Sequence, residues 1–330
     1  MEDNYQESRI GKRVPSLTTR REFIEQTARV VAGMTLTSAV ADAVLADGHK
    51  PPSAPLYKIS CTEYSLHRLI DKGELDNLDF ARFVRDEFEL DAVEYWNYPF
   101  FKKAEDKKYI SQLRKHADDV GVQGTVILVD GEGKLGDPDE AKRLAAVNAH
   151  KKWVECARQL GCHSIRVNAS SAGKRNDQLS LAADGLVRLA QFAKGLEMNV
   201  LVENHGGWSS NGKWLASVME KVGLDNCGTL PDFGNFGAYD RYQGVAELMP
   251  YARCVSAKSH DFDQDGNETQ TDYLRMMKIV TDAGYHDYVG IEYEGGRLGE
   301  VEGVKATQRL LESVREKLTV AGKGLQKTRA

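Results

Sequence analysis

The chain has 330 residues and a formal net charge of −5, from 44 basic and 49 acidic side chains. Both signs are spread along the sequence without a basic tract for phosphate backbones, so nucleic acid is disfavoured as a partner. Hydrophobic residues make up 41% of the chain, enough for a sizeable core. No run approaches the ~18 uninterrupted apolar residues of a membrane helix. The composition therefore predicts a soluble mature protein without a membrane partner.

The start of the chain has the features of an export signal. The pair Arg20-Arg21 precedes a weakly apolar stretch over 28–41, and the small residues Ala39-Val40-Ala41 close that stretch. This order resembles a twin-arginine signal peptide and predicts one over 1–41. The mature protein is then expected to be periplasmic or otherwise exported.

The alternative for this segment is a short amphipathic helix with two surface arginines. Arg29 interrupts the apolar stretch, and Glu25 stands where such signals usually carry a base; both favour that alternative. The order of the signal features favours export, and whether the signal is cleaved is left open.

The five cysteines are odd in number and show no Cys-x-x-Cys spacing, so a disulfide framework is not expected. Three of them, Cys61, Cys227 and Cys254, lie in apolar, strand-like runs, where a free thiol behaves as a small core residue. Free core thiols fit a protein that folds, and takes up metal, before it is exported.

Eight short apolar or β-branched runs recur along the chain, and most are separated by longer helical patterns. The predicted strands are 56–62, 92–96, 125–129, 164–168, 199–203, 228–232, 254–258 and 288–292. The predicted helices are 78–88, 109–119, 139–160, 181–196, 214–222, 271–283 and 304–318. Several helices are followed by a glycine that can close them, as Gly161 does.

This repetition predicts an α/β protein with a single (β/α)8 TIM barrel over 56–318. An open doubly wound sheet is the alternative, but no Gly-x-Gly-x-x-Gly follows the first strand. Residues 42–55, rich in Asp, Pro and Gly, are predicted to be a linker, and 319–330 a solvated C-terminal tail.

Four polar side chains fall at the ends of four consecutive predicted strands: Glu203, Asp232, His260 and Glu292. In a parallel barrel the C-terminal ends of all strands meet on one face. Carboxylates that converge there repel one another unless a cation lies between them. Three oxygen donors and one nitrogen predict a divalent metal, Mn²⁺ first, with Mg²⁺, Co²⁺ or Zn²⁺ as alternatives. Taken singly, a strand-end Asp can instead cap a helix, and a His can be a core residue.

The segments around these residues resemble a known group of proteins. They are similar to the four metal-bearing segments of the xylose isomerase-like TIM barrel superfamily, the sugar phosphate isomerase/epimerase family, which also includes endonucleases acting at abasic DNA sites. The matching segments are Val202-Glu203-Asn204-His205, Pro231-Asp232-Phe233-Gly234-Asn235, Lys258-Ser259-His260 and Ile291-Glu292-Tyr293-Glu294. The resemblance covers 56–318 and implies that Glu203, Asp232, His260 and Glu292 bind the metal.

The resemblance also implies that Glu203 and Glu292 are the catalytic acid and base. A metal that chelates a carbonyl and its neighbouring hydroxyl stabilises an enediolate, so two carboxylates can remove and return a proton. Two departures from the ketose epimerases, Asn235 in place of a His and Gly266 in place of an Arg, imply different substrate contacts. The trinuclear endonucleases need further histidines, and Asp130 follows the third strand where one would stand.

Six other polar or aromatic residues near the strand ends are candidate substrate contacts: Glu94, Lys258, His205, Asn235, Trp96 and Arg166. Lys258 is expected to point into the barrel mouth, where it could stabilise an oxyanion or pair with Glu94 or Glu292. Arg166 is either a substrate contact or a buried salt-bridge partner. His205 has the alternative of a plain loop residue.

Three functions are compatible with these residues. The first is a metal-dependent isomerase or epimerase that acts on a sugar through an enediolate. The second is a lyase that cleaves 3-keto-glycosides by β-elimination after the same proton abstraction. The third is a non-catalytic sugar-binding protein, which would not need two proton-transfer groups. The expected partner is a small carbohydrate, and homo-oligomerisation is left open.

Overall fold

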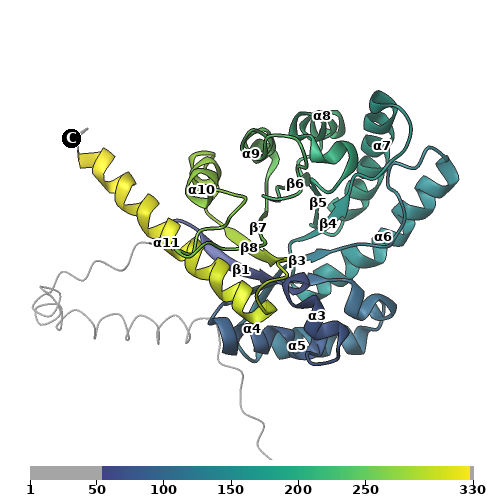
Figure 1. Cartoon of the computed structure of the whole chain (residues 1–330). Helices are drawn as coiled ribbons and strands as arrows, with labels where there is room; N and C mark the ends of the chain where they lie inside the picture. Colours follow the sequence, from purple (N-terminus) through teal and green to yellow (C-terminus); the bar gives the residue numbers. More distant parts are fainter. Residues whose placement is uncertain (1–53, 328–330) are drawn as a thin grey trace, which may run out of the picture. The chain divides into compact units, whose positions relative to one another are not determined.

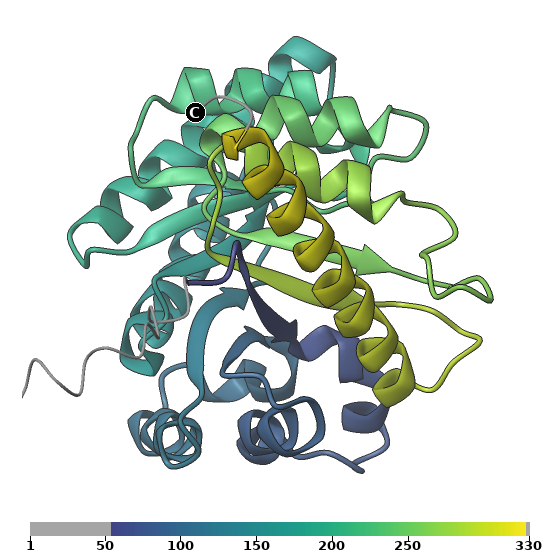
Figure 2. The same cartoon turned by 90° about the vertical axis from the view of Figure 1, so that its left-hand side faces the viewer.

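The computed structural model describes residues 54–327, so the predicted export signal and nearly all of the predicted linker lie outside the described residues. Eight parallel strands and the helices between them form one barrel. Figures 1 and 2 show the helices arranged around the strands. The predicted (β/α)8 TIM barrel is confirmed.

The strands match the predicted runs closely. They are β1 (Lys58–Thr62), β2 (Ala92–Trp96), β3 (Gln123–Leu128), β4 (Ser164–Asn168), β5 (Asn199–Glu203), β6 (Cys227–Leu230), β7 (Val255–Ser259) and β8 (Tyr288–Tyr293).

The α-helices surround this sheet. They are α3 (His67–Asp71), α4 (Phe80–Phe88), α5 (Lys107–Asp118), α6 (Glu140–Leu160), α7 (Arg175–Lys194), α8 (Gly212–Val222), α9 (Arg241–Leu248), α10 (Tyr273–Asp282) and α11 (Glu300–Lys327). Short 3-10 helices are η1 (Glu63–Leu66), η2 (Asn77–Asp79), η3 (Tyr98–Lys103), η4 (Gly207–Ser210) and η5 (Met249–Tyr251). α11 continues past the predicted barrel boundary at residue 318. Among the described residues, no helix has the length and apolarity needed to cross a bilayer.

Strand alternation separates the two faces of the sheet. Along β5, Val200 and Val202 join the large apolar core that includes the helices, whereas Leu201 joins a smaller inner cluster with Val126 and Leu230. Alternation then puts Glu203 on the same inner face as Leu201. Inner positions nearest the strand ends are therefore the ones that carry polar groups to the open face of the barrel.

The barrel closes between β6 and β7 through a short seam. The sheet order runs β6-β5-β4-β3-β2-β1-β8-β7, and two isolated parallel bridges, Thr229 to Ala252 and Asp232 to Ser256, join its two edges. Backbone hydrogen bonds run from Ser256 N to Pro231 O (2.9 Å) and from Phe233 N to Ser256 O (3.1 Å). This closure places Asp232 directly beside β7.

Candidate functional site

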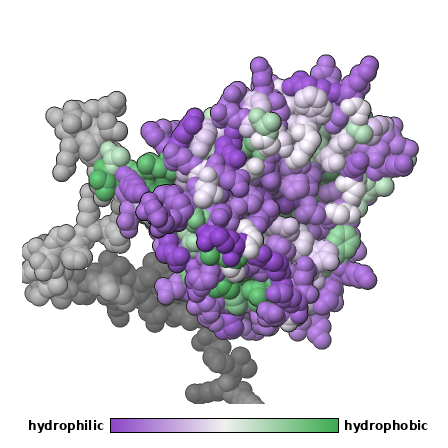
Figure 3. Space-filling model, in the orientation of Figure 1, coloured by the Kyte–Doolittle hydropathy of each residue, from purple (hydrophilic) through white to green (hydrophobic). Residues whose placement is uncertain are grey.

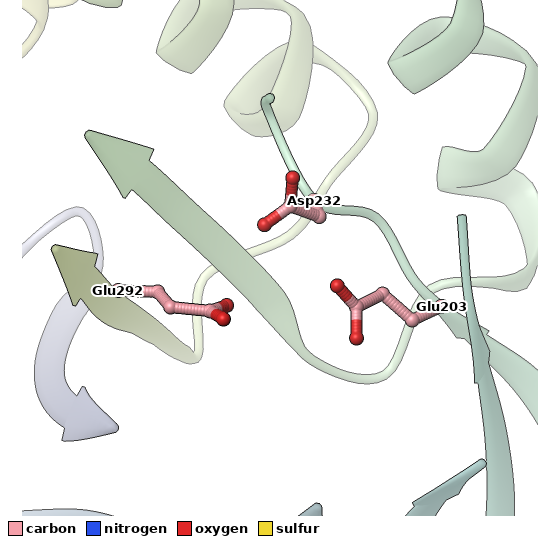
Figure 4. Close-up of side chains that lie close together, drawn as sticks. All are labelled: Glu203, Asp232 and Glu292. Atoms are coloured by element: carbon pink, nitrogen blue, oxygen red, sulfur yellow. The ribbon is translucent and has the colours of Figure 1, made fainter. Parts of the chain in front are cut away.

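Three carboxylates converge at the C-terminal ends of the strands. Glu203 is the last residue of β5, Asp232 follows β6 by two residues, and Glu292 lies near the end of β8. Each offers an oxygen, and these oxygens all lie within 4.8 Å of one another. Figure 4 shows the three side chains pointing toward a common space. All three residues are buried, with at most 5% of their surface exposed, so their mutual repulsion is not relieved by bulk water.

His260, the fourth predicted ligand, is not part of this group. β7 ends at Ser259, so strand alternation no longer fixes where residue 260 points. The backbone N–H of His260 faces Glu268 Oε1 at 3.3 Å. The structure therefore brings together three of the four predicted ligands and leaves out the one expected to supply nitrogen.

A lysine from β7 supplies positive charge instead. The Nζ of Lys258 donates to Glu292 Oε1 at 3.0 Å and to Glu294 Oε1 at 2.6 Å, and lies 3.6 Å from Asp232 Oδ2. Only 2% of Lys258 is exposed. Burial alone would lower the pKa of Lys258, but Asp232 and the neighbouring carboxylates outweigh burial and raise it. Lys258 is thus a buried cation, and of the two partners that the sequence left open, Glu94 and Glu292, it pairs with Glu292.

Several neutral side chains hold the carboxylates in position. Ser256 Oγ lies 2.9 Å from Asp232 Oδ2 and 2.7 Å from Glu292 Oε2. Asn235 donates through Nδ2 to Glu203 Oε1 at 2.9 Å, and its backbone N–H donates to Asp232 Oδ1 at 2.8 Å. Asn235, a predicted substrate contact, therefore helps to position two members of the cluster.

Arg166 is a buried ion-pair partner, the second of its two predicted roles. Its Nε lies 2.7 Å from Glu203 Oε2, and its Nη1 donates to Asp130 Oδ1 at 2.9 Å. The Nε and Glu203 Oε2 are close but too poorly aligned for a hydrogen bond, so both remain without a hydrogen-bond partner. Glu203 Oε2 is therefore neutralised by an ion pair with Arg166 that lacks hydrogen-bond geometry.

The two candidate proton-transfer groups differ in their tendency to ionise. Burial raises the pKa of Glu203 to about 8, with Glu292 and Asp232 adding to the increase and Arg166 opposing it. Burial also opposes ionisation of Glu292, but the charge of Lys258 and the hydrogen bond from Ser256 outweigh it and lower the pKa of Glu292. Two carboxyl groups with separated pKa values are the arrangement that acid–base chemistry requires.

Glu94 lies inside the barrel but does not pair with Lys258. Its carboxyl oxygens accept from Ser60 Oγ at 2.9 Å and from Thr62 Oγ1 at 2.8 Å. Burial raises the pKa of Glu94 to about 7, although both hydroxyls oppose the increase. Its hydrogen bonds connect β2 to β1.

Aromatic side chains lie beside the strand ends. Trp96 stacks on Tyr98, with ring centroids 4.7 Å apart, and meets the edge of Tyr64 at 5.0 Å. The Trp96 Nε1 is a buried donor without a hydrogen-bond partner. His205 is exposed in the loop after β5, where its backbone N–H donates to Ser209 Oγ at 2.9 Å. Trp96 therefore has an unused donor for a ligand.

The donor set is chemically suited to a divalent cation. Carboxylate oxygens are the ligands of Mg²⁺ and Mn²⁺, and the oxygens of Glu203, Asp232 and Glu292 are close enough together to bind one ion. Glu203 Oε2, however, already lies 2.7 Å from Arg166 Nε. Lys258 likewise places its ammonium group against two of the three carboxylates.

Comparison with known proteins identifies the family. The family model for the xylose isomerase-like TIM barrel matches residues 84–317, which is more than half of the chain. The chain belongs to this family. The resemblance inferred from the four strand-end segments is confirmed. A search of curated proteins gives no match.

Solved structures of the same fold include several sugar epimerases. A 3-keto-D-glucoside 4-epimerase from E. coli is 17% identical, with a TM-score of 0.58, over 73% of this chain and 94% of that chain. An L-ribulose 3-epimerase is 14% identical, with a TM-score of 0.66, over 82% and 98%. A protein named IOLI with a bound zinc atom is 14% identical, with a TM-score of 0.64, over 79% and 98%. At these identities the similarity establishes the fold.

In this xylose isomerase-like barrel, sequence reasoning missed several residues that shape the site. Ser256 precedes Lys258 by two residues and Glu294 follows Glu292 by two, so strand alternation alone could have placed both on the inner face. Asp130 was noted only as a departure from the endonucleases, although it follows β3 as closely as Asp232 follows β6. The same strand-end rule that found the carboxylates also covers Asp130.

Proposed function

We propose that this chain is an isomerase or epimerase that acts on a sugar by moving a proton next to a carbonyl group. The proposal rests on the close approach of Glu203 and Glu292, two buried carboxylates from β5 and β8, in a site that also contains Lys258. The family and the sugar epimerases that share its fold support it.

In the proposed reaction one carboxylate removes the proton and the other returns one to the carbon. Glu292 is the stronger candidate for the base because its pKa is held low, and Glu203 for the acid because its pKa is raised. Removal of a proton beside a carbonyl places negative charge on oxygen. Nearby positive charge stabilises that enediolate most when water is excluded, as it is at these buried side chains.

The sequence predicts that a divalent metal supplies this charge. Held by Glu203, Asp232 and Glu292, such an ion would polarise the substrate carbonyl. The zinc atom in one solved structure of this fold supports a metal of some kind in the family. Within this chain, Lys258 and Arg166 are the resident positive charges beside the same carboxylates.

The aromatic residues beside the strand ends suit a sugar. Trp96, Tyr98 and Tyr64 form a stacked and edge-on group, and aromatic faces pack against the C–H faces of sugar rings. The unpartnered Nε1 of Trp96 would donate to a substrate hydroxyl. We therefore propose Trp96 as a substrate contact, as the sequence predicts.

A β-eliminating lyase is the second candidate. It uses the same proton abstraction, and one solved structure of this fold is a probable 3-DHS dehydratase, 14% identical over 77% of this chain and 98% of that chain with a TM-score of 0.58. A leaving group on the carbon next to the carbanion would make elimination the outcome.

Incubation in D2O with free ketoses and with 3-keto-glycosides tests the proposal. Deuterium at an epimerised or isomerised carbon supports the isomerase, and release of an aglycone supports the lyase. Each incubation is run on metal-stripped protein with and without added Mn²⁺. If no carbon exchanges while a sugar still binds by calorimetry, the chain is a sugar-binding protein and the proposal is wrong.

A further inference from the structure

The Lys258 side chain lies on the side of the carboxylate cluster formed by Asp232 and Glu292. Its Nζ donates to Glu292 and Glu294 and lies 3.6 Å from Asp232. Lys258 comes from β7, Asp232 follows β6, and Glu292 and Glu294 lie at the end of β8, so the ammonium group reaches groups from both sides of its own strand. From this position its positive charge offsets the repulsion between Asp232 and Glu292.

The stem of Lys258 is held in place by its surroundings. Only 2% of the residue is exposed. The turn after Asp232 presses on the stem so closely that a Cβ added at Gly234 would lie 2.6 Å from Lys258 Cγ. The absence of a side chain at Gly234 thus makes room for the lysine stem.

The fourth position of the cluster is occupied by a hydroxyl group. Ser256, two residues before Lys258 on the same face of β7, lies within hydrogen-bond distance of both Asp232 and Glu292. The imidazole of His260 is not in the group. A divalent ion would therefore lack its expected nitrogen ligand and would have to approach an ammonium group that already contacts its oxygen ligands.

We propose that Lys258 is a tethered cation that takes the place of a tightly bound divalent metal at Glu203, Asp232 and Glu292. An ammonium group and a divalent ion compete for the same oxygens because each needs the negative charge and repels the other at this range. The proposal concerns the cation of the site, and it holds whether the reaction is isomerisation, elimination or neither.

The test compares metal binding by the wild-type chain with that of lysine variants. Lys258→Met removes the ammonium group while keeping an unbranched stem, and Lys258→Gln is a second neutral variant that can still donate hydrogen bonds. Lys258→Arg keeps the charge. Lys278→Met, at an exposed lysine that pairs with Asp282 on α10, is the matched control. Each protein is purified without added metal, its metal content is measured by elemental analysis, and Mn²⁺ is then titrated by calorimetry.

Wild type, Lys278→Met and Lys258→Arg should hold far less than one metal ion per chain and bind Mn²⁺ weakly. Lys258→Met or Lys258→Gln should bind Mn²⁺ at least about tenfold more tightly, since the competing charge is gone. Adding Glu203→Gln to either variant should remove that gain.

The proposal is overturned if wild type retains about one metal ion per chain, or if neither neutral variant gains affinity. Circular dichroism establishes which variants fold, and the wild-type measurement is decisive even if one of them does not. No measurement depends on turnover, so these outcomes are independent of the proposed reaction.

Discussion

At the scale of single residues, the proposed reaction depends on two carboxylates. Replacing Glu203 or Glu292 with Gln removes a proton carrier while nearly preserving its shape. Each change should lower kcat by ~10²–10⁴-fold, the usual contribution of a general acid or base. Turnover is followed as solvent deuterium exchange on the substrate found by screening. Glu316→Gln, at an exposed position on α11, is the control and should leave the rate unchanged. Full activity in either site variant would remove that residue from the mechanism.

Glu94 should make stability depend on pH. Its folded-state pKa is about 7, whereas an unfolded Glu titrates near ~4.3. Between those values the folded chain binds the extra proton, so the free energy of unfolding falls as pH rises, by up to about 4 kcal/mol in total, and levels off above pH ~7. Glu94→Gln can keep its contacts with Ser60 and Thr62 but cannot titrate. Its stability relative to wild type, from urea unfolding at several pH values, should therefore rise over this range. A constant difference between the two proteins would contradict the assignment.

The strand-end rule predicted the carboxylates, and strand alternation placed Lys258 in the barrel mouth but left its partner open between Glu94 and Glu292. Glu203, Asp232 and Glu292 were found because a charged residue closing an apolar run is conspicuous. His260 was predicted by the same strand-end rule and by its similarity to the family motif, yet it follows the end of β7, where the loop sets its direction. The contacts of Lys258 with Glu292 and Glu294 depend on the register of β7 against β8, which the sequence alone does not specify.

At the scale of elements, the β3–α6 loop packs directly on a glycine of α7. A Cβ added at Gly185 would lie within 2 Å of the Leu135 carbonyl oxygen, so Gly185→Ala forces the two segments apart. We expect a loss of roughly 1–3 kcal/mol in the free energy of unfolding. Gly195, at the end of the same helix, has ordinary helical φ and only a 3.5 Å contact. Gly195→Ala should therefore change stability by less than about 1 kcal/mol. If urea unfolding gave equal losses of stability for the two variants, the loss in Gly185→Ala could not be attributed to its close packing against Leu135.

The long, strongly patterned elements were predictable, and the short ones were not. The predicted strands 92–96, 164–168 and 199–203 have the observed bounds because each is an apolar run that ends at a turn signal. The helix α9 was missed, since it is only eight residues long and contains Gly244, which is unfavourable inside a helix. Its start was nevertheless marked by Asp240, whose carboxylate accepts from the N–H groups of Tyr242 and Gln243.

At the scale of the whole molecule, we propose that the folded chain is exported by the twin-arginine pathway. All five cysteines are free and buried, which suits folding before export. Replacing both Arg20 and Arg21 with Lys should hold the protein in the cytoplasm of a bacterium that has this pathway, as measured by fractionation. Arg13→Lys is the control and should not affect export. Equal export of the double variant and wild type would contradict the predicted signal.

The barrel should open first at the seam beside the site. Two isolated bridges join β6 to β7, whereas β1 and β8 share four consecutive paired residues. Opening the seam breaks few backbone hydrogen bonds. Local unfolding is expected to begin in the segments that are held by the fewest such bonds. The amides of Phe233, Arg253 and Ser256, which all donate across the seam, should therefore exchange with D2O at least about tenfold faster than those between β1 and β8. Hydrogen exchange resolved to single amides by NMR measures this. Equal exchange rates at the β6–β7 seam and between β1 and β8 would contradict this prediction. Side chains, Lys258 among them, would then stabilise the seam as much as the continuous backbone hydrogen bonds stabilise the β1–β8 pair.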